Sequence, residues 1–277
     1  MLTKSKDILI KARKEGYAIP AFNFENMEMA KAVISKCEEL NSPVILQTTK
    51  STLNYISPVI AKDIVSFYAK DVKIPVILHL DHSDNLELCE ECIRVGYTSI
   101  MIDGSKLPFE ENINLSKEVI KIAGDVPVEC ELGRIGGKED TEEKNPNLTS
   151  VKEAEEFVKR TGCSSLAVAI GTAHGFYKST PKLDFERLDE LAKTLPIPLV
   201  LHGTSGVETI DVKKAISLGI SKVNYATELR FAFSKGVRLS LEDKDVFDPK
   251  VYLNKGMETL KETIKERVYT CGSENKA

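Results

Sequence analysis

The sequence predicts an α/β protein that folds as a single (β/α)8 barrel over residues 1–277. Short apolar segments alternate along the chain with segments of helical periodicity, and eight strand–helix units can be counted. The strand segments are continuously apolar, as expected for parallel strands buried on both faces. The length of 277 residues also fits, because such barrels typically have about 250 residues. Eight successive units favour a closed barrel over an open sheet.

The expected strands follow one another at short intervals. In chain order they are AIPAFN, PVILQ, PVILHLD, TSIMID, PVECEL, SLAVAIG, PLVLHG and SKVNYA. The first three helices between them are expected to begin near Met27, Pro58 and Asn85, and each later strand is also followed by a helical segment. Proline directly before four strands and glycine after three helices agree with these boundaries.

Two segments lie outside the eight units. An amphipathic helix is expected near residues 3–15, and a helical tail is expected from about residue 248 to residue 268. Two connections, 133–150 and 174–183, are long, polar and contain glycine. Long loops in compact domains often close over an active site.

The composition excludes some classes of partner. With 38 basic and 42 acidic residues, the net charge of −4 offers no broad attraction for nucleic acid or for an anionic membrane. The charged N-terminal helix does not resemble a signal peptide, and no apolar run approaches the ~20 residues of a membrane span. Six cysteines without a secretory signal favour reduced thiols, so we expect a cytoplasmic protein.

Histidines stand at the carboxyl ends of the expected strands, where barrels of this type carry their active sites. Three of the four histidines in the chain, His82, His174 and His202, end three different strands. Each alone could be a packing or loop histidine. Three imidazoles that converge with a fourth position open are the ligand set of a catalytic zinc ion, so together they favour a metal site.

Carboxylates accompany these histidines. Asp81 directly precedes His82, and because successive strand residues point to opposite sides, we expect Asp81 to face away from the ion and to be free for proton transfer. Asp103 and Glu131 could orient the histidines, hold a second metal position, or bond the backbone of a loop. His79, two residues before Asp81, is expected inside the barrel, either packed in the core or supporting the site.

Two segments have the features of phosphate-binding loops. The sequence GTSG at 203–206 follows the seventh strand and leads into a helix, so it offers backbone N–H groups and hydroxyls. The segment 224–227 follows the eighth strand in the same way, and phosphate between these two loops is a recurrent barrel feature. GTSG by itself is also an ordinary turn. Loop 133–140 is either a lid that delivers Glu139 or an exposed charged loop.

Six motifs in this order resemble those of the class II ketose-bisphosphate aldolases. They are LHLDH at 78–82, MIDGS at 101–105, VECELGRIGGKED at 128–140, AVAIGTAHG at 167–175, LHGTSG at 201–206 and NYATE at 224–228. The resemblance extends from GYAIPAFN near the N-terminus to FDPKVYL in the tail. It implies a TIM-barrel fold and reversible cleavage of a ketose 1,6-bisphosphate to dihydroxyacetone phosphate and glyceraldehyde 3-phosphate through a zinc-stabilised enediolate.

The resemblance also implies a role for each site residue. His82, His174 and His202 match the Zn²⁺ ligands. Asp103 and Glu131 match a second divalent-metal position. Asp81 matches the group that moves the proton of the C4 hydroxyl, and Glu139 matches the base at C3. Contacts to dihydroxyacetone phosphate, with a monovalent cation (Na⁺ or K⁺) beside its phosphate, are implied for Gly175, Gly203, Thr204, Ser205, Asn224, Tyr225, Ala226 and Thr227.

Departures from the family pattern bear on the sugar. Ala173 and Ala226 are closer to the tagatose-bisphosphate type, so tagatose 1,6-bisphosphate is favoured and fructose 1,6-bisphosphate is the alternative. Lys250 stands where the family usually has arginine, which keeps the charge but loses the bidentate fork. The family tail implies a homodimer or homotetramer. Two other hypotheses are less favoured: a non-catalytic barrel subunit beside a partner aldolase, and another zinc barrel enzyme such as a hydrolase. The residues expected for the metal count against the first, and the two phosphate loops count against the second.

Overall fold

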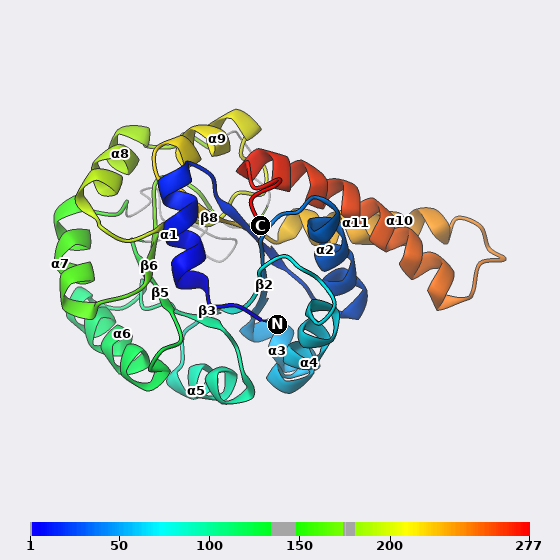
Figure 1. Ribbon diagram of the computed structural model, residues 1–277, viewed down its shortest axis with the longest axis horizontal. Helices are drawn as coiled ribbons and strands as arrows, with labels where there is room; N and C mark the ends of the chain where they lie inside the picture. Colours follow the sequence, from blue (N-terminus) through cyan, green and yellow to red (C-terminus); the bar gives the residue numbers. More distant parts are fainter. Residues whose placement is uncertain (1, 134–147, 174, 176–180) are drawn as a thin grey trace.

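Eight parallel strands form a closed barrel in the computed structural model, which describes residues 2–133, 148–173, 175 and 181–277 (Figure 1). Each strand is hydrogen-bonded to the next along the chain, and the last pairs with the first. The predicted fold class is therefore confirmed. The strands are β1 (Ile19–Asn23), β2 (Val44–Thr49), β3 (Val76–Ser83), β4 (Ser99–Ile102), β5 (Val128–Leu132), β6 (Ser165–Val168), β7 (Leu199–Leu201) and β8 (Ile220–Tyr225).

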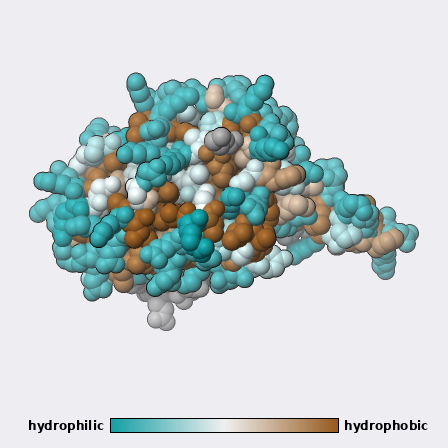
Figure 2. Space-filling view, turned by 60° about the horizontal axis from the view of Figure 1, so that its bottom comes forward, coloured by the Kyte–Doolittle hydropathy of each residue, from teal (hydrophilic) through white to brown (hydrophobic). Residues whose placement is uncertain are grey.

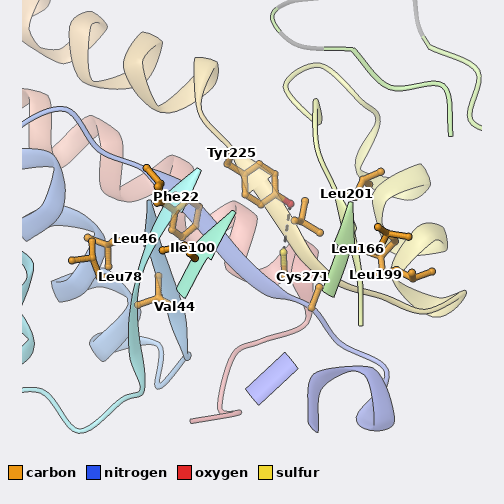
Figure 3. Close-up of a cluster of buried hydrophobic side chains, with 14 of the residues drawn as sticks. Phe22, Val44, Leu46, Leu78, Ile100, Leu166, Leu199, Leu201, Tyr225 and Cys271 are labelled. Atoms are coloured by element: carbon orange, nitrogen blue, oxygen red, sulfur yellow. Dashed lines mark hydrogen bonds between the residues drawn. The ribbon is translucent and has the colours of Figure 1, made fainter. Parts of the chain in front are cut away.

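Helices surround the barrel, and the predicted N-terminal helix and helical tail are both present. The helices are α1 (Ser5–Glu15), α2 (Met27–Glu39), α3 (Lys50–Ile56), α4 (Pro58–Ala69), α5 (Leu86–Val95), α6 (Phe109–Ala123), α7 (Val151–Thr161), α8 (Phe185–Thr194), α9 (Thr209–Ser217), α10 (Thr227–Ser240) and α11 (Pro249–Cys271). Outward-facing strand residues such as Val44, Leu46 and Leu78 lie in the main core against the helices (Figure 3). Burial of each such side chain stabilises the fold by about 1.5–3 kcal/mol.

Helix α3 was not expected from the sequence. The side chain of Thr49 accepts a hydrogen bond from the backbone N–H of Thr52 and begins this helix. Ser57, with φ of 66°, ends it and caps α4, in which Pro58 is the first residue. Seven residues are too few to show a helical period clearly, so the sequence pattern revealed only the longer helix α4.

Helix α1 lies across the amino-terminal end of the barrel (Figure 1). Its Leu9 and Ala12 form a small core with Ile19, Ile45 and Ile77, which come from the first halves of three strands. Apolar side chains therefore close the amino-terminal end of the barrel interior. Buried polar residues begin at the level of Ile19, with which Lys222 pairs in register, and continue towards the carboxyl ends of the strands, where the candidate site lies.

Helices α10 and α11 pair as a hairpin that projects from the barrel (Figure 1). Glycines allow the two helices to cross closely: a Cβ added to Gly256 would lie 2.9 Å from the side chains of Phe233 and Val237. Helix α11 also packs against α2, which anchors the base of the hairpin. Within the described part of the chain, none of the helices combines the length and apolar character required to cross a lipid bilayer.

Candidate metal centre

Two of the three predicted histidine ligands meet at the carboxyl end of the barrel. His82 is the residue before the last in β3, and His202 directly follows β7. The ring centroids are 4.6 Å apart in an edge-to-face arrangement, and Nε2 of His82 lies 2.9 Å from Nδ1 of His202. His174 lies outside the described residues, so its place as the third ligand stays a prediction.

Asp81 belongs to the same cluster as the histidines. Asp81, His82 and His202 each place one possible ligand atom within 4.8 Å of the others. The expectation that Asp81 and His82 point to opposite sides of the strand end is therefore wrong, whereas the role of Asp81 in proton transfer stays a prediction. His82 has a φ of 49°, and the pairing of β3 with β4 shifts register between Leu80 and Ser83. This local bulge breaks the alternation of the strand and turns His82 towards the side on which Asp81 lies.

Three side-chain amides surround the carboxylate of Asp81. Asn23 and Gln47 donate to Oδ2 at 3.1 and 3.2 Å, and Asn224 donates to Oδ1 at 3.1 Å. Burial alone raises the pKa of Asp81, but His82, His202 and the donors outweigh it, so the pKa lies below its usual value. An ionised carboxylate held by fixed donors can accept a proton from a bound substrate.

Sequence reasoning missed Asn23 and Gln47. Both are polar residues inside otherwise apolar strand segments, and Gln47 pairs in register with His79. A polar residue in a strand buried on both faces must find a partner, which is the signal that could have revealed them.

A second acidic group lies beside His82. Its Nδ1 is 3.0 Å from Oδ2 of Asp103, and Oε2 of Glu131 lies 3.8 Å from the same nitrogen. Burial raises the pKa of Asp103, but its bond with His82 outweighs this and lowers it. Burial and the charge of Asp103 raise the pKa of Glu131 well above its usual value. His82, Asp103 and Glu131 thus form a second group of possible metal ligands, and the second metal position implied for Asp103 and Glu131 stays a prediction.

The proton arrangement in the cluster fits a bound cation. Carboxylates accept the ring protons at Nδ1 of His82 and Nε2 of His202, so the two nitrogens that face each other both present lone pairs. A positive charge must lie between them. An added proton on His82 meets this need, because Asp81, Asp103 and Glu131 outweigh burial and raise its pKa to about 10. Imidazole nitrogens with adjacent carboxylates equally suit Zn²⁺.

Buried polar atoms without partners point to a ligand at this end of the barrel. Among the described residues, Oε2 of Glu131, Oγ1 of Thr172, Oδ1 of Asn224 and Oε1 of Gln47 are buried and accept or donate no hydrogen bond. Folded proteins rarely leave such groups unsatisfied. Glu131 lies beside both histidines, and Gln47 and Asn224 bond Asp81, so the unsatisfied oxygens of these three residues are consistent with an ion and a polar substrate.

A line of buried polar residues continues below the histidines into the barrel. Nε2 of His202 lies 2.9 Å from Oε1 of Glu129, and Oε2 of Glu129 accepts from Nζ of Lys222 at 2.8 Å. Nζ of Lys222 is also 3.2 Å from Nε2 of His79. Burial and the charge of Lys222 lower the pKa of His79 well below its usual value, so this ring is neutral. The expectation that His79 is packed inside the barrel is confirmed.

Lys222 was not recognised in the sequence. It lies two residues before Asn224 in β8, so both side chains point into the barrel by the alternation of the strand. The sequence alone showed only a lysine near the start of the eighth strand segment, which is a common place for an exposed charge.

The predicted phosphate loops lie together after β7 and β8. Gly203 has a φ of 67°, and a Cβ there would lie 2.6 Å from the carbonyl oxygen of Ala173. The hydroxyl of Thr204 donates to the backbone carbonyl of Asn224, which ties the two loops to each other. Ser205 is buried beside Thr204, whereas Ala226 and Thr227 form the first turn of α10. Gly175 has a φ of 95°, and its substrate contact stays a prediction.

The side chain of Tyr225 lies in the core instead of the site. Its ring centroid is 5.7 Å from that of Phe22, and its hydroxyl is hydrogen-bonded to Sγ of Cys271 in α11 (Figure 3). Only the backbone of Tyr225 can therefore contribute to the predicted substrate contact. Glu139 lies outside the described residues, so its role at C3 also stays a prediction.

The closed barrel carries titratable side chains and two loops at the carboxyl ends of its strands. This is the organisation of a (β/α)8-barrel enzyme. The chain belongs to the class II fructose-bisphosphate aldolase family, whose model matches residues 3–276. It is accordingly an aldolase, a lyase that acts on a carbon–carbon bond.

Solved structures of aldolases resemble the chain over its whole length. The YdjI aldolase from Escherichia coli K12 is 37% identical, with 100% of both chains covered and a TM-score of 0.90. A candidate fructose-1,6-bisphosphate aldolase from Coccidioides immitis is 27% identical, with 99% of this chain and 98% of that chain covered and a TM-score of 0.90. Fructose-bisphosphate aldolase from Campylobacter jejuni is 27% identical, with 98% and 95% covered and a TM-score of 0.86.

Proposed function

We propose that the protein is a Zn²⁺-dependent aldolase that reversibly cleaves tagatose 1,6-bisphosphate to dihydroxyacetone phosphate and glyceraldehyde 3-phosphate. The observation that carries the proposal is the convergence of Asp81, His82 and His202 at the carboxyl end of the barrel. When bound, Zn²⁺ supplies a Lewis acid that withdraws electron density from the substrate carbonyl.

Residues of the chain have separate roles in this proposal. His82 and His202, with His174, hold the metal, and Asp103 and Glu131 form a second cation position beside it. Asp81, held by three amides, takes the proton of the C4 hydroxyl as the C3–C4 bond breaks. Glu139 returns a proton to C3. Loops 203–205 and 224–227 bind the phosphate of dihydroxyacetone phosphate, with Na⁺ or K⁺ beside it.

The metal requirement can be tested by chelation. Removal of the metal is expected to abolish cleavage, and added Zn²⁺ is expected to restore it. Activity that survives chelation and is lost with borohydride plus substrate would instead indicate a Schiff base on a lysine.

The choice of sugar depends on small side chains near the site. Ala173 and Ala226 favour the tagatose type, and fructose 1,6-bisphosphate is the alternative because the two sugars differ only at C4. Cleavage of both bisphosphates by the zinc-loaded enzyme is the test. A tenfold higher kcat/KM for fructose 1,6-bisphosphate, about 1.4 kcal/mol in transition-state binding, would reverse the assignment.

The aldehyde half of the substrate needs a separate test. Lys250 is 86% exposed in the first turn of α11, and its Nζ lies 2.8 Å from Asp248 of the same chain. Within the described residues, the ion partner of Lys250 is therefore Asp248 and not a residue of the metal cluster. Condensation of dihydroxyacetone phosphate with aldehydes that carry or lack a terminal phosphate, in the native enzyme and in Lys250→Ala, measures its contribution.

We also propose that two or four copies of the chain associate. Large apolar side chains are exposed on the helical hairpin and on α3 and α4, with Phe247 87%, Tyr55 77% and Phe67 71% exposed. The face turned forward in Figure 2 shows hydrophobic surface between hydrophilic side chains. The projecting hairpin offers each copy an element to pack against the other. Sedimentation equilibrium tests this: a monomer at micromolar concentration would contradict the proposal.

The six cysteines, all buried thiols, support a place in the reducing cytoplasm.

A further inference from the structure

Four buried side chains form a continuous hydrogen-bonded line that ends at a metal-facing histidine. Nε2 of His202 lies 2.9 Å from Glu129, Glu129 lies 2.8 Å from Lys222, and Lys222 lies 3.2 Å from His79. All four are buried inside the barrel, at 2% exposure or less. Bulk water therefore does not satisfy these groups, and each must be satisfied by its neighbours.

The donors and acceptors in this line are fixed in one order. Lys222 has only donors, so it donates to Oε2 of Glu129 and to Nε2 of His79. The other oxygen of Glu129 must then accept, and the proton between it and His202 lies on Nε2 of His202. A neutral imidazole with its proton on Nε2 has its lone pair on Nδ1, the nitrogen that faces His82.

We propose that Glu129 and Lys222 are positioning residues that hold His202 in the tautomer whose Nδ1 lone pair faces the metal. Neither residue touches the metal or the substrate in this arrangement. Glu129 acts through His202, and Lys222 acts through Glu129. The inference rests on the proposed metal centre and deepens it.

Stability alone does not account for the pair. Burial of an ion pair costs desolvation that its attraction often fails to repay, so an apolar pair of similar volume would serve the core equally well. The strands next to Glu129 and Lys222 carry apolar residues at the same level of the barrel: Met101 pairs in register with Glu129, and Val200 pairs with Lys222. Met101 and Val200 form a small buried cluster with Ala167. The charged pair stands only where a histidine must be oriented.

Glu129→Gln should reverse the direction of the hydrogen bond between residue 129 and His202. Lys222 would still require an acceptor, so the carboxamide oxygen would face Lys222 and its NH₂ would face His202. The amide would then donate to Nε2 of His202 and drive the ring proton to Nδ1, where it blocks the metal. We expect Zn²⁺ affinity, measured by competition with a chromophoric chelator, to fall by about 10- to 100-fold.

The double variant Glu129→Gln/Lys222→Met tests the role of Lys222. Without the ammonium, the amide of residue 129 is free to turn its oxygen to His202, so Zn²⁺ affinity should recover by at least about threefold over Glu129→Gln alone. A merely structural pair would instead lose more in the double variant. Ser99→Ala is the matched control: it breaks the 2.8 Å contact at the far side of His79 and should keep Zn²⁺ affinity within about threefold of the native value.

The tautomer of His202 can be observed directly in the native protein, without metal or substrate. The chain has only four histidines, so ¹⁵N-histidine labelling gives few ring signals to assign. We expect Nε2 of His202 to carry the proton in the native protein, and Nδ1 to carry it in Glu129→Gln. A proton on Nδ1 of His202 in the native protein would overturn the proposal even if no variant folds. Folded Glu129→Gln with native Zn²⁺ affinity would also overturn it. Neither readout depends on cleavage, so failure of the sugar assignment is distinguishable.

Discussion

Substitution of Gly203 by alanine gives a sharp test of the loop that joins the metal centre to the predicted phosphate site. The new Cβ would lie 2.6 Å from the carbonyl oxygen of Ala173, whereas ordinary contacts begin at 3.4 Å, so the two loops must separate by about 0.8 Å. The left-handed backbone, with φ of 67°, adds its own cost for alanine. Overpacking costs about 1–3 kcal/mol and the left-handed conformation about 1 kcal/mol, so we expect a total loss of about 2–4 kcal/mol.

Gly162→Ala is the matched control for this substitution. Gly162 has nearly the same φ, 70°, but a Cβ there would have no atom within 4 Å. It should therefore lose only the backbone contribution of about 1 kcal/mol in urea unfolding. The difference between the two variants measures the contact with Ala173.

Kinetics separate the loop displacement from simple instability. Gly203 directly follows His202, and a displacement near 1 Å in a catalytic site can cost about 100-fold, so kcat/KM of Gly203→Ala should fall at least about tenfold. Gly162→Ala should keep native kinetics. Equal unfolding free energies for the two variants, or native kcat/KM in folded Gly203→Ala, would refute the reasoning.

Three further substitutions or reactions have defined outcomes. His202→Ala should lower bound zinc, measured by atomic absorption, whereas Asp81→Ala should keep zinc and lower kcat by about 100-fold or more; zinc loss in the latter would contradict the separate roles. Gly256→Ala should force α10 from α11 and lower the Tm, unlike Lys255→Ala on the exposed side; an unchanged Tm would show that the hairpin adapts. All six thiols are buried, so a disulfide reagent at pH 8 should react with them only after unfolding, and burial also raises the pKa of Cys89 to about 11 and that of Cys271 to about 12; rapid reaction of the native protein would contradict this.

Much of the fold could be predicted because each strand is a continuous apolar run that is easily told from the segments around it. Parallel strands buried on both faces read as apolar runs, and the eight runs correspond to β1 to β8. The same pattern placed His82 and His202 at strand ends, and closure of the barrel places these ends on one face of the molecule. Helix α3 was not predicted, because seven residues are too few to show helical periodicity.

The details of the site depended on contacts that no local pattern contains. The alternation rule placed Asp81 opposite His82, but a register shift and a positive φ at His82 reversed that result. Lys222 and Glu129 are far apart in sequence, and only barrel closure shows that they share a hydrogen bond. Pairings of this kind depend on register around the whole barrel, which a single sequence does not specify.

Barrel closure also determines when during folding the site can exist. The contact between His82 and His202 spans 120 residues, and that between His79 and Lys222 spans 143. Contacts of such separation carry a large loop-closure entropy and form late. A nascent chain that has completed β3 but lacks β7 and β8 therefore offers only part of the ligand set. If the proposed metal centre holds Zn²⁺, we therefore expect its capture to coincide with the final pairing of the strands, so that Zn²⁺ uptake would mark the last step of folding.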